Sequence, residues 1–363
     1  MRLPSVPFAV LLTLVAVPTV TAPARLHAQE RLPLLSAPPI EHYLEALRQQ
    51  AGIPGMSATV VQDGQVVWEH GFGFENVESR IRATPDTPYY VGGLSQTLAA
   101  VLLLQCVEQR RLTLDEPVRR FGVSLPEDGA TLRHVLSHAS GPPAGTYRFA
   151  PDRYGQLGNV MEWCAPQPYR KSVAHRVLEF LAMRDSVPGA DLRDSGVVPE
   201  GLFDASALER YRRVLERVAV PYRSEGRNKA VRAEPPAAEG ISAASGLVTT
   251  VRDLARFDIA LDSELLLLDG TRAAAWAAGT AADGTSMPTG LGWFVQSYRD
   301  EPVVWQYGHL PNAYSSMIIK LPARRLTLIL LANSDGLAAP FDLAAGDITK
   351  SLFATLFLRL FIP

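Results

Sequence analysis

The sequence predicts an α+β fold whose antiparallel sheet is built from both ends of the chain and flanked by helices. Runs rich in β-branched and aromatic residues occur at 56–69 and again between 292 and 332. Apolar residues at helical spacing fill most of the region between them. Strands at the two ends with helices between them therefore predict one sheet with a helical insertion beside it.

The individual elements follow in order along the chain. A helix is predicted at 41–50, and the pair Asp63-Gly64 between two β-rich runs predicts a hairpin with a type I′ turn. Thr250 is a helix-capping residue, with Asp253 three positions on. Further helices are predicted at 96–109, from 131, and at 169–183, 205–218, 250–261 and 339–361. Further strands are predicted at 292–297, 303–307, 315–321 and 325–332.

Composition argues against several classes of function. The 363 residues include 35 basic and 37 acidic side chains without a basic tract, so we expect no nucleic-acid partner. Two cysteines are too few for a structural zinc site or a disulfide-rich module. Neither a His-Glu-x-x-His nor a Gly-x-Ser-x-Gly motif occurs in the sequence. We expect no cofactor and no metal.

Residues 1–28 predict a secretory signal peptide. Met1-Arg2 carries positive charge, 8–20 is an apolar run too short to span a bilayer comfortably, and Ala28 is a small residue at the cleavage position. We expect cleavage near Ala28, a proline-containing linker at 29–39, and a secreted or periplasmic protein without a stable membrane span. An uncleaved membrane anchor is the alternative.

The two cysteines, Cys106 and Cys164, both lie in apolar helical patterns. Export would place them in an oxidising compartment, where they could pair, but the sequence does not give their separation. We expect two buried free thiols.

Several segments, taken in order, resemble one family. The likeness to the serine β-lactamase and penicillin-binding-protein-like family, especially its class C and esterase-like branch, lies in 53–64, 112–118, 132–143 (LRHVLSHASGPP), 180–186 (FLAMRDS) and 244–257 (ASGLVTTVRDLARF). It covers nearly all of 40–335 and implies a β-lactamase/transpeptidase-like fold. It implies one domain at 40–363, with a sheet lobe formed by 40–88 and 285–363 and a helical lobe at 89–284.

The resemblance also implies a chemistry that needs three constellations. A Ser-x-x-Lys pair at the start of a helix puts a nucleophile and its proton acceptor on one helix face. A Tyr-x-Asn loop supplies a further base. A Lys or His, then a small or hydroxyl residue, then Gly on a strand place hydrogen-bond donors against the substrate.

This sequence departs from all three constellations. Gly93 stands at the serine position and Gln96 at the lysine position, so nucleophile and proton acceptor are both absent. Phe149-Ala150-Pro151 replaces Tyr-x-Asn, and a phenylalanine has no hydroxyl. His309-Leu310-Pro311 keeps only the histidine of the third motif, and we expect Pro311, which lacks an N–H, to perturb an edge strand. None of the four lysines has a serine three residues before it.

Other residues could rebuild a site. Ser95 is a candidate rescue nucleophile, although its position on another helix face favours a structural role. His134 and His138, four residues apart, could hold a metal, but no third ligand presents itself. His309 could bind an anionic ligand, and the backbone N–H groups of Gly93 and Asn312 could persist as an oxyanion hole.

Three hypotheses about function follow. The first is an exported, catalytically impaired family member whose cleft binds a peptide, a cell-wall fragment or a partner protein. The second is an active serine hydrolase of β-lactamase, esterase or peptidase type with a rebuilt active site. The third is a purely structural interaction protein whose cleft is filled by residues such as Phe149 and Leu310. The family-equivalent pocket positions in these hypotheses are Gly93, Gln96, Phe149, Pro151, His309 and Asn312.

Overall fold

The computed structural model describes residues 38–194, 201–225 and 230–362, all of which belong to one compact unit, Leu34–Pro363. The predicted signal peptide and most of the predicted linker lie outside the described residues. Among the described helices, none has the length and apolar character needed to cross a membrane.

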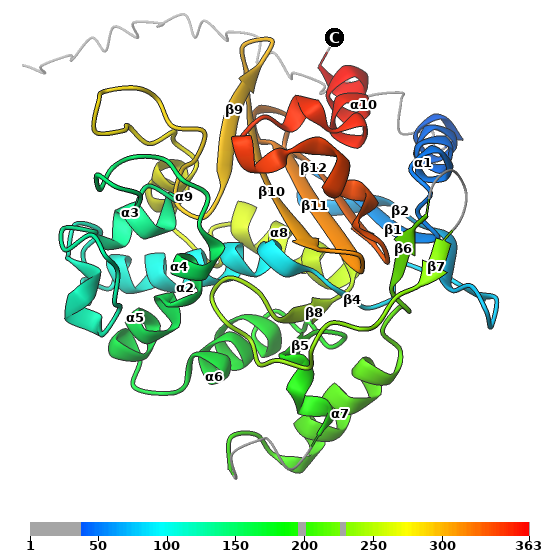
Figure 1. Ribbon diagram of the computed structural model, residues 1–363, viewed down its shortest axis with the longest axis horizontal. Coiled ribbons are helices and arrows are strands. Elements are labelled where there is room, and N and C mark those ends of the chain that lie inside the picture. The colour runs from blue at the N-terminus through cyan, green and yellow to red at the C-terminus, as the bar shows by residue number, and fades with distance from the viewer. Residues whose placement is uncertain (1–37, 195–200, 226–229, 363) are drawn as a thin grey trace, which may run out of the picture. The chain divides into compact units, whose positions relative to one another are not determined.

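A seven-stranded antiparallel sheet lies at the centre of this unit (Figure 1). Its strand order is β3-β2-β1-β12-β11-β10-β9, so the two ends of the chain meet where β1 pairs with β12. The predicted α+β fold, with a sheet built from both ends, is confirmed. The strands are β1 (Gly55–Gln62), β2 (Gln65–Asn76), β3 (Ile81–Arg82), β9 (Phe294–Tyr298), β10 (Glu301–Leu310), β11 (Tyr314–Leu321) and β12 (Leu326–Ala332).

The hairpin between β1 and β2 forms as the sequence predicts. Asp63 and Gly64 both have positive φ angles, 52° and 75°, which is the backbone of a type I′ turn. Gln62 and Gln65 face each other across this two-residue loop. The turn therefore sets the register beside the loop, and the register shifts once between Val60 and Val61.

Helices cover both faces of the sheet. Side chains of β11 alternate between the faces, and Lys320 contacts Asp258 of α8 (Val251–Asp262) on one of them. On the other face, Met317 lies 4.0 Å from Ser351, the N-cap residue of α10 (Leu352–Phe361). The helix α1 (Pro38–Gln50) packs against α10 and β2. Strands β11 and β12 are consequently buried along their whole length.

The middle of the chain forms a helical region beside the sheet (Figure 1). Its central helix is α2 (Ser95–Glu108), which is rich in apolar residues and buried over nearly its whole length. The other helices are α3 (Leu132–Leu136), α4 (Pro151–Gly155), α5 (Leu157–Cys164), α6 (Tyr169–Val173), α7 (Ala205–Glu216) and α9 (Asp269–Ala275). The short strands are β4 (Tyr89–Tyr90), β5 (Val187–Pro188), β6 (Tyr222–Ser224), β7 (Ala230–Arg232) and β8 (Leu247–Thr249).

Local capping signals decide where some of these helices begin. The Thr250 side chain accepts a hydrogen bond from the Asp253 N–H at 3.1 Å, so the predicted start of α8 is confirmed. The predicted helix at 169–183 is less regular than expected, because α6 is followed by a π-helical turn over Ala174–Glu179.

The C-terminal region does not form the single helix predicted for 339–361. Asp342 and Gly346 have left-handed backbone, with φ angles of 39° and 85°. Gly346 also lies against Pro288, where a side chain would not fit. Tertiary contact therefore overrides local helical character until α10 begins. The segment before α10 consists of the short 3₁₀ turns Ala339–Phe341, Leu343–Ala345 and Ile348–Lys350.

Cys106 and Cys164 form a disulfide, so the expectation of two free thiols is wrong. Their Cα atoms lie 6.2 Å apart because α5 packs directly against α2. This proximity of residues separated by 58 positions is a product of helix packing, which the sequence pattern does not reveal.

We expect the disulfide to stabilise the fold by about 4 kcal/mol, because it closes a loop of 58 residues and restricts the unfolded chain. Chemical unfolding with and without reductant measures the difference. The Cys106→Ala/Cys164→Ala double variant is the control, since its unfolding should not respond to reductant. Equal midpoints for oxidised and reduced wild-type protein would contradict this expectation.

Candidate functional site

The start of α2 lies against the end of β10. Gly93 belongs to the turn Gly92–Leu94 that leads into α2. The last residues of β10, from Gln306 to Leu310, extend beyond the part of the strand that pairs with β9, which ends at Trp305. This unpaired edge of β10 is the surface on which the predicted site residues gather.

Two glycines let the backbones of the turn and of β10 touch. A Cβ atom on Gly93 would overlap the carbonyl oxygen of Tyr307, and one on Gly308 would overlap the carbonyl oxygen of Val91. The Ser316 hydroxyl of β11 donates a 2.7 Å hydrogen bond to the same Val91 oxygen. Gly93 therefore has neither a side chain nor the space for one while this contact is kept.

Gln96 is fully buried and bonded to neutral groups. Its Oε1 atom lies 2.9 Å from Nε2 of His138 and 3.5 Å from Nε2 of Gln306. Its Nε2 atom has no hydrogen-bond partner among the described residues. The position that resembles the family's lysine is thus occupied by an uncharged amide in an uncharged network.

Both ring nitrogens of His138 are engaged. Nδ1 accepts a 3.2 Å hydrogen bond from the Ala150 N–H, so the ring proton resides on Nε2 and is donated to Gln96. Burial lowers the pKa of His138 to about 3. The ring is therefore neutral at ordinary pH, and its one lone pair is already in use.

Phe149 belongs to an aromatic cluster rather than to a polar loop. Its ring centroid lies 4.6 Å from that of His138, 5.7 Å from that of Tyr307 and 5.9 Å from that of Phe294. The side chain is half-buried. Pro151, two residues on, is exposed and begins α4 at a position where a helix needs no N–H donor.

His309 and Asn312 lie at the exposed end of β10. The His309 side chain is 35% exposed, and its Nε2 lies 3.9 Å from Oδ2 of Asp335. The Asn312 N–H donates to the same oxygen at 2.9 Å, so it is not free to form the expected oxyanion hole. His309 and this N–H hold the pKa of the Asp335 carboxyl below its usual value.

Pro311 does not disturb a strand as expected. β10 ends at Leu310, which pairs with Tyr314 of β11, and Pro311 lies in the turn between them. A turn position requires no ladder hydrogen bond, so the missing N–H has no consequence there.

Ser95 and His134 have structural contacts. The Ser95 hydroxyl is buried and accepts a 3.3 Å hydrogen bond from the Leu247 N–H. His134 Nδ1 accepts from the Thr131 N–H at 3.2 Å and completes the N-terminal cap of α3. Among the described residues, no group of three or more His, Cys, Asp or Glu side chains could hold a metal ion.

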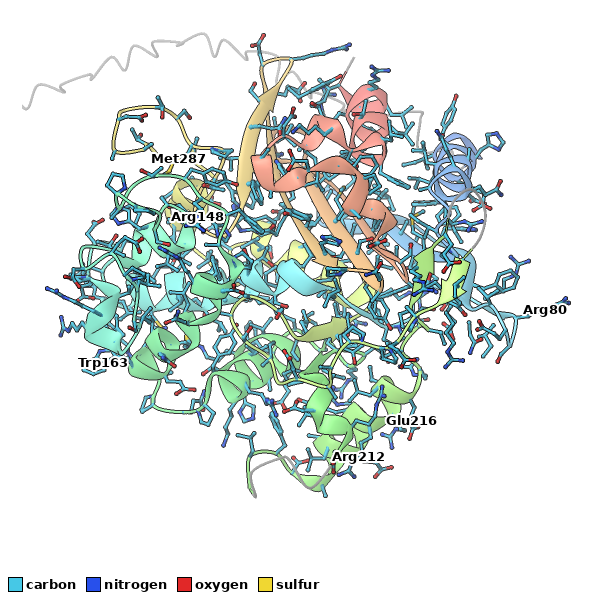
Figure 2. All side chains as sticks on the ribbon, viewed as in Figure 1. Arg80, Arg148, Trp163, Arg212, Glu216 and Met287 are labelled. Atoms are coloured by element: carbon cyan, nitrogen blue, oxygen red, sulfur yellow. A yellow bond between two sulfur atoms is a disulfide. The ribbon has the colours of Figure 1, made fainter. Side chains whose placement is uncertain are left out.

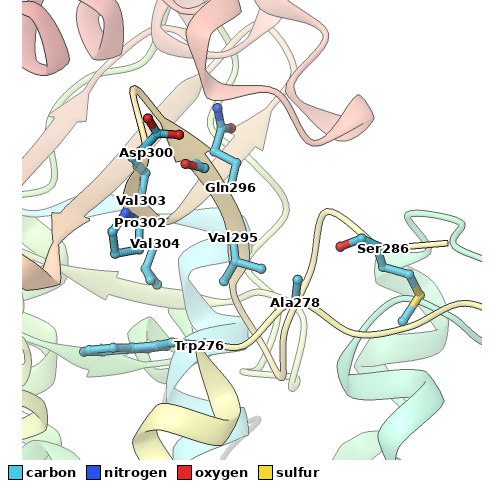
Figure 3. A pocket seen from close by; sticks show the side chains of 11 residues that line it. Trp276, Ala278, Ser286, Val295, Gln296, Asp300, Pro302, Val303 and Val304 are labelled. Atoms are coloured by element: carbon cyan, nitrogen blue, oxygen red, sulfur yellow. The ribbon is translucent and has the colours of Figure 1, made fainter.

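A separate hollow lies along the sheet edge (Figure 3). It has a volume of about 400 Å³ and is walled by Val295 of β9, Val304 of β10 and Trp276, which lies flat at its base. Gly93, Gln96, Phe149 and His309 do not line it. This hollow is not the site that the sequence predicts.

The structure thus brings Gly93, Gln96 and Phe149 together around the edge of β10, with His309 at its exposed end. Sequence reasoning missed the involvement of Gln306 and Tyr307, and it missed that His138 bonds Gln96. His138 lies in the segment 132–143 that carries the resemblance, but only the turn after α3, where His138 has a φ of 51°, aims its ring at α2.

The sheet, the helical region and the contact between α2 and β10 define a scaffold of the β-lactamase and penicillin-binding-protein type. The chain belongs to the beta-lactamase family, whose model matches residues 40–353. It is similar in structure to an octameric penicillin-binding protein homologue from Pyrococcus abyssi, with a TM-score of 0.69 and 21% identity, over 88% of this chain and 76% of that one.

Two curated relatives match shorter regions. The mitochondrial serine beta-lactamase-like protein LACTB of Homo sapiens is 32% identical over 105 residues, which are 27% of this chain and 19% of LACTB. The putative penicillin-binding protein PbpX of Bacillus subtilis (strain 168) is 22% identical over 249 residues, 61% of this chain and 57% of PbpX. This chain therefore spans about a fifth of LACTB and little more than half of PbpX.

We expect Gly93→Ser to lower the free energy of unfolding by about 1–3 kcal/mol, because the added atoms displace the β10 backbone. Chemical unfolding measures the loss. Gly129→Ser is the matched control, since no atom lies within 4 Å of a Cβ at that position. If both variants are equally stable, the contact between Gly93 and Tyr307 is looser than described.

The buried His138 should make stability depend on pH. In the unfolded chain its pKa is the ordinary 6.5, whereas in the fold it is about 3, so only the unfolded state takes up a proton between these values. The contribution is complete above pH 6.5 and is lost as the pH falls towards 3. Between about pH 7 and about pH 5 the loss amounts to about 2 kcal/mol.

Unfolding free energies of the wild type and of His138→Asn across this pH range check the expectation. Asparagine tolerates the left-handed backbone of residue 138, and the variant should lose this part of the pH dependence. His175→Asn, at an exposed position, should keep it. Equal pH slopes for wild type and His138→Asn would be the contradicting result.

Proposed function

We propose that this protein is an exported, catalytically impaired member of the beta-lactamase family that forms no acyl-enzyme. The observation that carries the proposal is the closed contact at Gly93, where the Tyr307 carbonyl oxygen occupies the space that a nucleophilic side chain would need. The chain keeps the family's scaffold, but its site lacks the groups that acyl transfer requires.

The proton-transfer groups at this site support the same proposal. Gln96 is a neutral amide and does not accept a proton at ordinary pH. His138 and Tyr154 are titratable groups bonded to Gln96. The Ala150 N–H occupies the free lone pair of His138 and burial keeps it neutral, while burial raises the pKa of Tyr154 and keeps its hydroxyl protonated. Phe149 offers a ring where the family offers a hydroxyl. Loss of a nucleophile and its bases typically reduces rates by about four to six orders of magnitude.

In this proposal the exposed end of β10 binds the ligand. His309 and the half-buried Phe149 present a hydrogen-bonding group and an aromatic surface to solvent. Such a surface suits a peptide, a cell-wall fragment or a partner protein. The predicted signal peptide supports encounter with these ligands outside the cytoplasm, after cleavage near Ala28.

Specific observations bear on the two alternative functions, a rebuilt hydrolase and a purely structural protein. An active hydrolase that uses Ser95 would need a hydroxyl open to substrate, whereas this hydroxyl is buried and accepts from Leu247. A purely structural protein with a filled cleft is favoured by the packing of Phe149 on Tyr307. The exposure of His309 favours a remaining ligand surface over that alternative.

We expect no covalent labelling when the purified protein is exposed to a fluorescent penicillin or a fluorophosphonate. The physical reason is that no oxygen nucleophile stands at residue 93, and intact-protein mass spectrometry provides the measurement. Ser95→Ala is the matched control. Stoichiometric labelling of the wild type that disappears in Ser95→Ala would establish the rebuilt hydrolase instead.

The binding part of the proposal has its own readout. Thermal shift with muropeptides and short peptides should reveal ligands whose effect is reduced in His309→Ala but kept in His175→Ala. The labelling test and the binding test can fail independently of each other. An unlabelled protein whose ligand response is unaffected by His309→Ala would be impaired, as proposed, but would bind elsewhere.

A further inference from the structure

Two adjoining hollows lie between α7 and the turn at 180–186, and both are lined by Arg184 and Arg210. The larger has a volume of about 480 Å³ and the smaller about 240 Å³. No residue of the site at Gly93 lines either of them. We refer to the two together as the arginine groove.

The larger hollow is lined by more basic than acidic side chains. Its charged lining consists of the four arginines Arg184, Arg210, Arg213 and Arg217 and the two carboxylates Asp185 and Glu216. Asp185 and Arg217 form an ion pair and offset each other, and the smaller hollow adds the carboxylate of Glu179. The chain as a whole has a formal net charge of −2, so this concentration of guanidinium groups is a local feature.

Arg184 has a fixed backbone and a free side chain. Its N–H donates to the Ala182 oxygen at 2.9 Å, and the next N–H, that of Asp185, donates to Asp253 at 2.8 Å. Its guanidinium has no hydrogen-bond or ion-pair partner within 38–194, 201–225 and 230–362. An exposed guanidinium without such a partner offers its donor fork to an oxyanion.

Arg210 is held beside it. Its Nη1 donates to the Arg184 carbonyl oxygen at 3.1 Å, and its guanidinium lies 4.5 Å from the centre of the Tyr211 ring. Both arginines line the same two hollows, where an anion would reduce the repulsion between their charges. Arg213 forms an ion pair with Glu209, which lies outside the hollow lining, so its charge is partly offset.

Arg210 and Arg213 of α7 and its C-cap residue Arg217 lie along one face of the helix. Positions 210, 213 and 217 follow the spacing of three and four residues that aligns side chains along a helix. Seven residues of helix span roughly 10 Å. Arg213 and Arg217 are ion-paired, so among the described residues Arg184 and Arg210 are the guanidinium groups of the lining left for a ligand. Two such donor forks suit an anion with two phosphate groups.

We propose that the arginine groove binds a diphosphate, either free or carried on an organic group. Guanidinium forks match the planar pairs of phosphate oxygens, and several of them can share one diphosphate. The inference stands apart from the proposed function, because the two sites have no residue in common.

Isothermal titration of the full-length protein with pyrophosphate, at constant ionic strength, tests the proposal. Arg184→Ala should weaken binding by about tenfold or more, because it removes a charge-assisted donor. Glu216→Gln should tighten binding several-fold, because it removes a like charge from the lining. Arg212→Ala is the matched control: Arg212 lies on the same helix but does not line the groove, and Figure 2 labels it together with Glu216.

The result that overturns the proposal is either no binding of pyrophosphate at millimolar concentration or an equal loss in Arg184→Ala and Arg212→Ala, which would indicate unspecific charge attraction. A titration with ADP distinguishes the two sources of the diphosphate. Binding of ADP at least as tight as that of pyrophosphate supports an organic diphosphate. Weaker binding of ADP supports the free anion.

Discussion

The contact between the turn before α2 and the end of β10 is the constraint on which the site depends. Gly93 and Gly308 lie where a Cβ atom would meet a carbonyl oxygen of the opposite backbone. Close approach of these backbones lets Ser316 reach Val91 and brings Gln306 to Gln96. A side chain at either glycine would force the turn before α2 and the strand β10 apart.

Lys320 and Gln96 show that a buried position can hold a charge only where a counterion lies beside it. Burial alone would lower the pKa of Lys320, but Asp258 and Asp262 reverse this and raise its pKa, so the lysine stays charged inside the protein. Gln96 is just as buried, yet its hydrogen-bonding neighbours His138 and Gln306 are neutral. A lysine at 96 would have no counterion among these neighbours, whereas the neutral amide needs none.

Local patterns allowed much of the fold to be predicted, whereas long-range contacts did not follow from them. The Asp63-Gly64 turn and the Thr250 cap each depend on a few neighbouring residues, and both form as expected. The disulfide and the broken C-terminal helix depend on packing between distant segments, such as Gly346 against Pro288. The same holds at the site. The sequence identifies Gly93 as lacking a nucleophile, but only the position of Tyr307 shows that the space is gone.

The charged groups around His309 bear on which ligand suits the exposed end of β10. His309 has a carboxylate, Asp335, 3.9 Å away, and this carboxylate also accepts from the Asn312 N–H. An anionic group directly at His309 would therefore face a negative charge already in place, so a neutral hydrogen-bonding part of a peptide or cell-wall fragment suits this position better. The arginine groove has the opposite character, because Arg184 lacks such a partner among the described residues. In the two proposals the surfaces therefore take ligands of different charge, and a ligand of either surface would have no electrostatic reason to occupy the other.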